Sequence, residues 1–148
     1  MAEDILNWPR VGSDQRLYVC RPAERQWKGG LEDIHATVRG GEATQGWIFS
    51  GDDYQAGHLV LTIMQTVPML VIGIDVPINQ YDTDGNIMWE PRPRVHFRHG
   101  LPLDEVEAKS RINLRDLHGY LAAPDIRGVL SAMKSIHAAD TGIFGSIP

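Results

Sequence analysis

The chain lacks the features that mark several protein classes. Its single cysteine, Cys20, leaves no partner for a disulfide within the chain, so stability does not require an oxidising compartment. No apolar run reaches the roughly 20 residues of a membrane-spanning helix, because polar residues interrupt the longest run, 59–76. The first residues are acidic, whereas a secretory signal begins with basic ones. We therefore expect no membrane association and a location in the cytoplasm, or in a particle assembled there.

Basic residues are absent from the middle of the chain. No lysine or arginine occurs between residues 40 and 91, although seven acidic residues do. The formal net charge is −5, and binding to a phosphate backbone requires a surplus of lysine and arginine. We therefore expect no nucleic-acid partner. The acidic middle suits either a basic protein partner or the solvated surface of a sheet.

Hydrophobic patterning predicts strands in the first two thirds of the chain. The length of 148 residues is that of one domain, which we expect to span 1–148. Two segments, 58–65 and 69–76, are apolar on both faces, which is typical of central strands joined here by a tight hairpin. Prolines 91 and 93 indicate an edge strand or a break. The remaining predicted strands are 16–20, 31–39, 46–50, 87–89 and 94–97.

The last third changes to helical spacing. A charged stretch after Pro102 is typical of a helix start, and Asn113 is a candidate cap for a helix over Leu114–Leu121. A further helix is predicted to begin at Ala123 and to end at Thr141–Gly142. Strands followed by helices indicate an α+β fold: a mostly antiparallel sheet of about five or six strands, with two C-terminal helices packed on one face.

Candidate metal ligands lie near residue 96. His96 and His99, with Glu90 as a further ligand and Asp75 nearby, form the basis of an alternative hypothesis, a metal-dependent hydrolase whose bound water is the nucleophile. In a regular strand the two histidines would point to opposite faces, so this site requires a turn after His99. Asp75 has a simpler interpretation as a buried carboxylate paired with an arginine of residues 92–98.

No cofactor is implied by the glycine pattern. The glycine pairs at 29–30 and 40–41 match neither a phosphate-binding loop nor a dinucleotide fingerprint, and no serine lies in a nucleophile elbow. The sequence therefore favours a protein without catalytic activity.

Both ends of the chain are apolar, about 1–10 and about 142–148. Apolar ends either dock on their own domain or act as arms on a neighbour. This pattern favours a protein-binding or assembly domain that binds a protein partner or itself as a homo-oligomer. Two forms stay open, an inhibitor or immunity-type protein and a subunit of a cytoplasmic or viral assembly. The candidate interface residues are Trp8, Trp27, Trp47, Ile143, Phe144 and Ile147.

Overall fold

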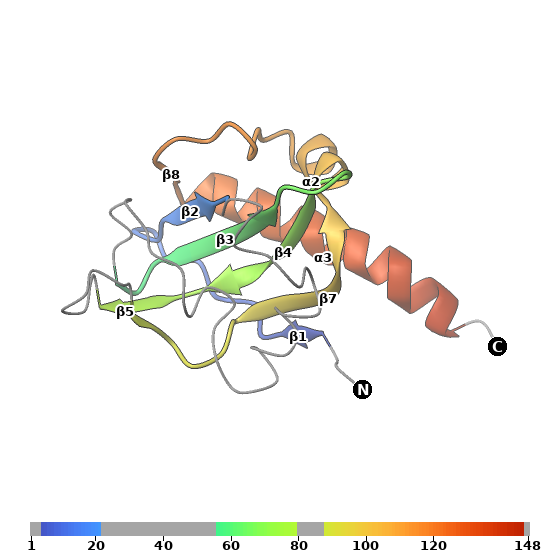
Figure 1. Ribbon diagram of the computed structural model, residues 1–148, viewed down its shortest axis with the longest axis horizontal. Helices are drawn as coiled ribbons and strands as arrows, with labels where there is room; N and C mark the ends of the chain where they lie inside the picture. Colours follow the sequence, from blue (N-terminus) through green and yellow to red (C-terminus); the bar gives the residue numbers. More distant parts are fainter. Residues whose placement is uncertain (1–3, 22–55, 80–87, 147–148) are drawn as a thin grey trace.

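The computed structural model describes residues 4–21, 56–79 and 88–146 (Figure 1). The main sheet has six strands in the order β1-β7-β4-β3-β2-β8. Its strands are β1 (Ile5–Leu6), β2 (Leu17–Cys20), β3 (Leu59–Met64), β4 (Leu70–Asp75), β7 (Val95–Pro102) and β8 (Tyr120–Leu121). Every neighbouring pair is antiparallel except β2 with β3, which is parallel. Together with two C-terminal helices, this sheet confirms the predicted α+β fold.

Four further elements complete the described part of the chain. They are β5 (Pro77–Asn79) and β6 (Met88–Trp89), which pair in a small second sheet, and the helices α2 (Leu103–Ser110) and α3 (Ala123–Ser146). The strands predicted at 31–39 and 46–50 lie outside the described residues. The predicted break at the two prolines is confirmed, since β6 ends before them and β7 begins after them.

The hairpin of β3 and β4 lies at the centre of the sheet. All of β3 and all but the first residue of β4 are buried, as the apolar runs predict. In the turn between them, the hydroxyl group of Thr66 donates a hydrogen bond to the carbonyl oxygen of Pro68 over 2.8 Å. Because the hairpin is buried on both faces, the sheet needs a cover on each side.

One of these covers is helical. Leu61, Ile74 and Phe97 point to the same side of the sheet. They belong to one buried cluster that includes Ile126 and Met133 of α3, which crosses the sheet on this side (Figure 1). The helical spacing of apolar residues in α3 therefore supplies the main core of the protein.

The helix α3 begins as predicted but ends later. Pro124 and Asp125 occupy its first turn, where a proline and an acid are favoured. The predicted end at Thr141–Gly142 is wrong, because the helix continues to Ser146. A glycine within a helix costs only about 1 kcal/mol relative to alanine, which does not suffice to end one. No helix in the described part of the chain combines the length and apolarity needed to cross a membrane.

The helix predicted over Leu114–Leu121 is wrong. Gly119 adopts φ +81°, and Tyr120–Leu121 pair with β2 as strand β8. The helix that does form is α2, which starts directly after Pro102 as the charged stretch suggests. Leu114 and Leu121 are nevertheless buried. The spacing of these leucines therefore predicts their burial correctly but predicts the wrong secondary structure.

The carboxylate of Glu107 in α2 is hydrogen-bonded to the start of the segment 114–121, for which the sequence predicts a helix. Glu107 Oε2 accepts hydrogen bonds from the backbone N–H groups of Leu114 (2.8 Å) and Arg115 (3.0 Å), and its Oε1 accepts one from Arg115 Nε (2.8 Å). Burial raises the pKa of Glu107, but these hydrogen bonds outweigh it and leave the pKa below its ordinary value. Glu107 therefore ties the loop after α2 to the helix as a carboxylate.

The backbones of β4 and β7 approach closely at Gly73. A Cβ atom at this position would lie 2.2 Å from the carbonyl oxygen of Val95, which is closer than any real contact. The register of the pair shifts between Val71 and Gly73. Position 73 therefore requires glycine, because there is no space for a Cβ atom between the two strands.

Replacing Gly73 with alanine should destabilise the protein, because the backbone of β7 must move to admit the methyl group. We expect the free energy of unfolding to fall by about 1–3 kcal/mol in urea denaturation. The control is Gly128→Ala in α3, where the nearest atom is 3.9 Å away and a gain of about 0.5–1 kcal/mol is expected. Equal stability of G73A and the wild type would contradict the close approach.

Glu107→Gln should lower the free energy of unfolding by about 1–3 kcal/mol at pH 7, since an amide cannot replace both acceptor oxygens. The pKa of Glu107 is lowered in the folded state. Its contribution is therefore present above the pKa of the unfolded chain and lost as the pH falls through the folded value.

Urea unfolding of wild type and E107Q between pH 7 and pH 3 measures this difference. The two stabilities should converge in acid, whereas the exposed Glu105→Gln should follow the wild type throughout. A difference between E107Q and wild type that is independent of pH would contradict the role of the charge.

Candidate functional site

The candidate metal ligands lie in different environments. His96 is buried in β7, with 3% of its surface exposed, whereas His99 is exposed. The carboxylate of Glu90 accepts two hydrogen bonds from the guanidinium group of Arg94, at 2.8 and 3.1 Å. Residues 4–21, 56–79 and 88–146 contain no group of three or more histidine, cysteine, aspartate and glutamate residues that could hold a metal ion. The structure therefore does not assemble Glu90, His96 and His99 into one site.

The sheet face opposite the helices carries the buried polar residues of the described chain. These are Thr62, Asp75 and His96. Across the sheet, Thr62 and His96 flank Gly73, and Asp75 pairs with Val60, which belongs to a small cluster separate from the main core. Asp75 thus lies within the sheet, fully buried, and not at an exposed strand end.

The N-terminal segment docks on its own domain. Its strand β1 pairs with β7, and Asp4 lies just before that strand. Asp4 Oδ1 accepts a hydrogen bond from the backbone N–H of Arg98 (2.7 Å), and Asp4 Oδ2 lies 2.6 Å from His137 Nε2 on α3. The ring of Trp8 lies 6.1 Å from that of Phe97, with Lys134 Nζ 5.4 Å from its centre. These contacts favour docking over exchange of an arm.

The other candidate interface residues are only partly placed. Ile143 and Phe144 belong to the last turns of α3. Trp27, Trp47 and Ile147 lie outside the described residues. The interface hypothesis therefore stays a prediction for these five.

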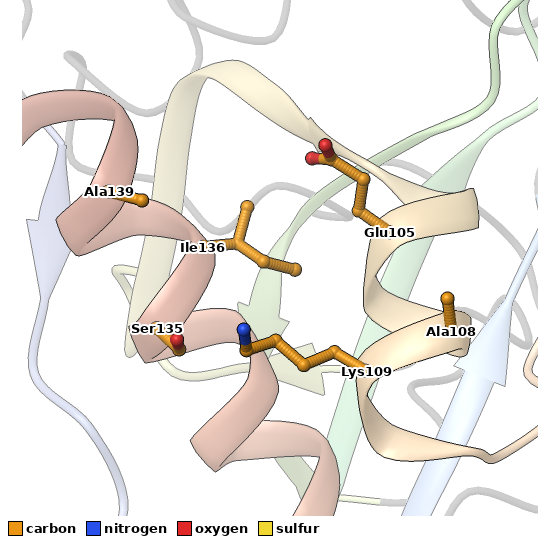
Figure 2. A pocket seen from close by; sticks show the side chains of 6 residues that line it. All are labelled: Glu105, Ala108, Lys109, Ser135, Ile136 and Ala139. Carbon is orange, nitrogen blue, oxygen red and sulfur yellow. The ribbon is translucent and has the colours of Figure 1, made fainter.

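A shallow groove lies between α2 and α3. Its volume is about 440 Å³, and it is lined by Glu105, Ala108, Lys109, Ser135, Ile136 and Ala139 (Figure 2). We call this the α2–α3 groove. Figure 2 shows that α2 supplies one wall and α3 the other, with the Lys109 side chain extending towards α3.

The groove exists because the side chains at its walls are small. Ala108 and Ala139 are both exposed and do not fill the space between the two helices. Its floor is Ile136, which also belongs to the main core and is 8% exposed. Glu105 and Lys109 are exposed and add one charge of each sign to the rim. The surface is therefore an apolar trough with a charged edge.

The chemistry of the groove suits binding. Lys109 and Ser135 are both exposed to water, whereas a lysine that acts as a base or nucleophile is desolvated in an apolar pocket. An apolar trough between helices is the kind of surface that accepts an amphipathic segment of a protein.

The sequence predictions missed this groove. The predicted helix from Ala123 includes Ile136, which is buried in the structure, but the sequence alone does not single out the residues around it. The alanines at 108 and at 138–139 were the available signal, since small residues on two packed helices leave space. They indicate a groove only when the relative position of the helices is known.

Comparison with protein-family models, with curated proteins and with solved structures gave no match for this chain.

Trp8→Ala should destabilise the protein, because the ring packs on Phe97 beneath Lys134. We expect a loss of about 2 kcal/mol for this half-buried side chain, and a fall in melting temperature of about 6 °C. The control is Leu6→Ala, in the same segment, where the side chain is 39% exposed and a much smaller change is expected. An unchanged melting temperature with altered sedimentation would assign Trp8 to a partner surface instead.

Proposed function

We propose that this protein is a non-catalytic protein-binding or assembly domain, and that the α2–α3 groove is its binding surface. The observation that carries the proposal is the groove itself, an apolar trough of about 440 Å³ between two helices. Water in contact with Ile136, Ala108 and Ala139 is released when an apolar segment covers them, which is a favourable contribution to association.

The long helix α3 adds support. A helix of 24 residues rises about 36 Å, and the C-terminal end of α3 extends past the sheet and past α2 (Figure 1). Ala138 and Ala139 are exposed where this end begins. A helix that leaves its domain next to an apolar groove favours an assembly subunit over an inhibitor that acts through an acidic sheet face.

Photo-crosslinking tests the proposal in cells that naturally make the protein. A photoreactive amino acid at Ala139 should give adducts with a protein, because the groove is covered in the bound state. The same amino acid at Asp125, an exposed residue of the first turn of α3, is the control. Absence of any protein adduct at Ala139, or equal adducts at both positions, would overturn the proposal.

A further inference from the structure

A further groove lies between α3 and the N-terminal segment. Its volume is about 290 Å³, and none of the residues that line it belongs to the α2–α3 groove. Trp8 and Val11 of the N-terminal segment pack on the main core and so hold this segment beside the helix. The residues that line the groove are Pro9, Val11, Arg127, Leu130, Ser131 and Lys134. We call it the basic groove.

Two cations of α3 are positioned in the basic groove by the N-terminal segment. Arg127 Nη2 donates a hydrogen bond to the carbonyl oxygen of Val11 over 3.0 Å. Lys134 Nζ lies 5.4 Å from the centre of the Trp8 ring, a distance that allows a cation–π contact. These contacts restrict both side chains before a ligand arrives, so less side-chain entropy is lost when one binds.

The charge of the basic groove has one sign. Arg127 and Lys134 are exposed, and neither forms a salt bridge with a carboxylate of residues 4–21, 56–79 and 88–146. They are seven residues apart, which is about 10 Å along the helix axis. Ser131, also exposed, lies on the same side of α3, since positions 127, 131 and 134 follow spacings of four and three. The groove therefore offers two cations, with a hydroxyl group between them.

We infer that the basic groove binds an acidic segment of a partner protein, whose carboxylates contact Arg127 and Lys134 and whose apolar side chain covers Pro9 and Leu130. This inference goes beyond the proposed function, which concerns the α2–α3 groove. Charge complementarity supports it, because both cations attract carboxylates and the hydroxyl group of Ser131 can donate a hydrogen bond to one. The chain as a whole carries a net charge of −5, so an acidic segment is attracted only where cations gather.

A phosphate backbone matches the basic groove less well than an acidic peptide. Nucleic-acid binding draws on a surplus of lysine and arginine, whereas this groove has two cations in an acidic chain. Pro9 and Leu130 also give the groove an apolar surface, which a phosphate backbone leaves in water. An apolar side chain of a peptide removes that surface from water, which is favourable.

Fluorescence anisotropy with the purified full chain tests this inference. The probe is a labelled peptide of glutamate and leucine with blocked ends, and a second probe has glutamine in place of each glutamate. At about 50 mM salt, wild type should bind the glutamate peptide at least about tenfold more tightly than the glutamine peptide. Lys134→Glu should raise the dissociation constant of the glutamate peptide at least about tenfold, because it places a like charge against a carboxylate of the ligand.

The matched control is Arg92→Glu, which changes the net charge by the same amount at an exposed residue outside the basic groove. This variant should bind the glutamate peptide like wild type. Lys134→Gln removes the cation without adding a like charge and should weaken binding less than K134E does. The melting temperature of each variant shows that the protein measured is folded.

Four outcomes would overturn the inference. They are no binding of the glutamate peptide to wild type, equal binding of the two peptides, equal weakening by K134E and R92E, and tighter binding of a single-stranded thymidine oligonucleotide than of the glutamate peptide. The last would assign the basic groove to phosphate. The proposed function is tested apart from these, by the adduct at Ala139 in the other groove, so either proposal can fail without the other.

Discussion

The burial of the β3–β4 hairpin on both faces is the constraint from which the rest of the structure follows. Two apolar faces need two covers, and α3 provides one by packing Ile126 and Met133 over Leu61 and Ile74. On the other face, Val60 packs with Tyr18, Cys20 and Trp89, beside the buried groups of Thr62, Asp75 and His96. The α2–α3 groove lies between the two helices, where Ala108 and Ala139 leave space.

The sequence predicts correctly those helices and strands whose apolar residues have the spacing of the secondary structure that forms. Apolar runs identified β3 and β4, and the spacing from Ile126 onward identified α3. The pattern gives a wrong helix at Leu114–Leu121, since leucines three and four residues apart, two of them buried, also fit a loop held by Glu107 and a short strand. Gly142 predicts the end of α3, but the helix continues to Ser146, because one glycine costs only about 1 kcal/mol of helix stability relative to alanine.

Candidate sites were harder to predict than elements. The proposed ligands Glu90, His96 and His99 are close in sequence, but Glu90 bonds to Arg94 and the two histidines differ in burial. The groove shows the opposite case: residues 105–109 and 135–139 are distant in sequence and meet only through the packing of α2 on α3. The spacing of residues in the sequence predicts the faces of one helix or strand at a time. It does not predict a surface that forms only when two helices pack together.

The contact between Asp4 and His137 has a consequence for how the chain folds. It joins residues 133 positions apart, so it forms only after nearly all of the described chain has been synthesised. Until then the N-terminal segment cannot be held on α3, although β1 can already pair with β7 and the Asp4 carboxylate can already accept the hydrogen bond from Arg98. Contacts of such separation slow folding, because the entropy of closing a long loop is lost before the contact stabilises the chain. We therefore expect the contact between Asp4 and His137 to form late in folding, after β1 has paired with β7.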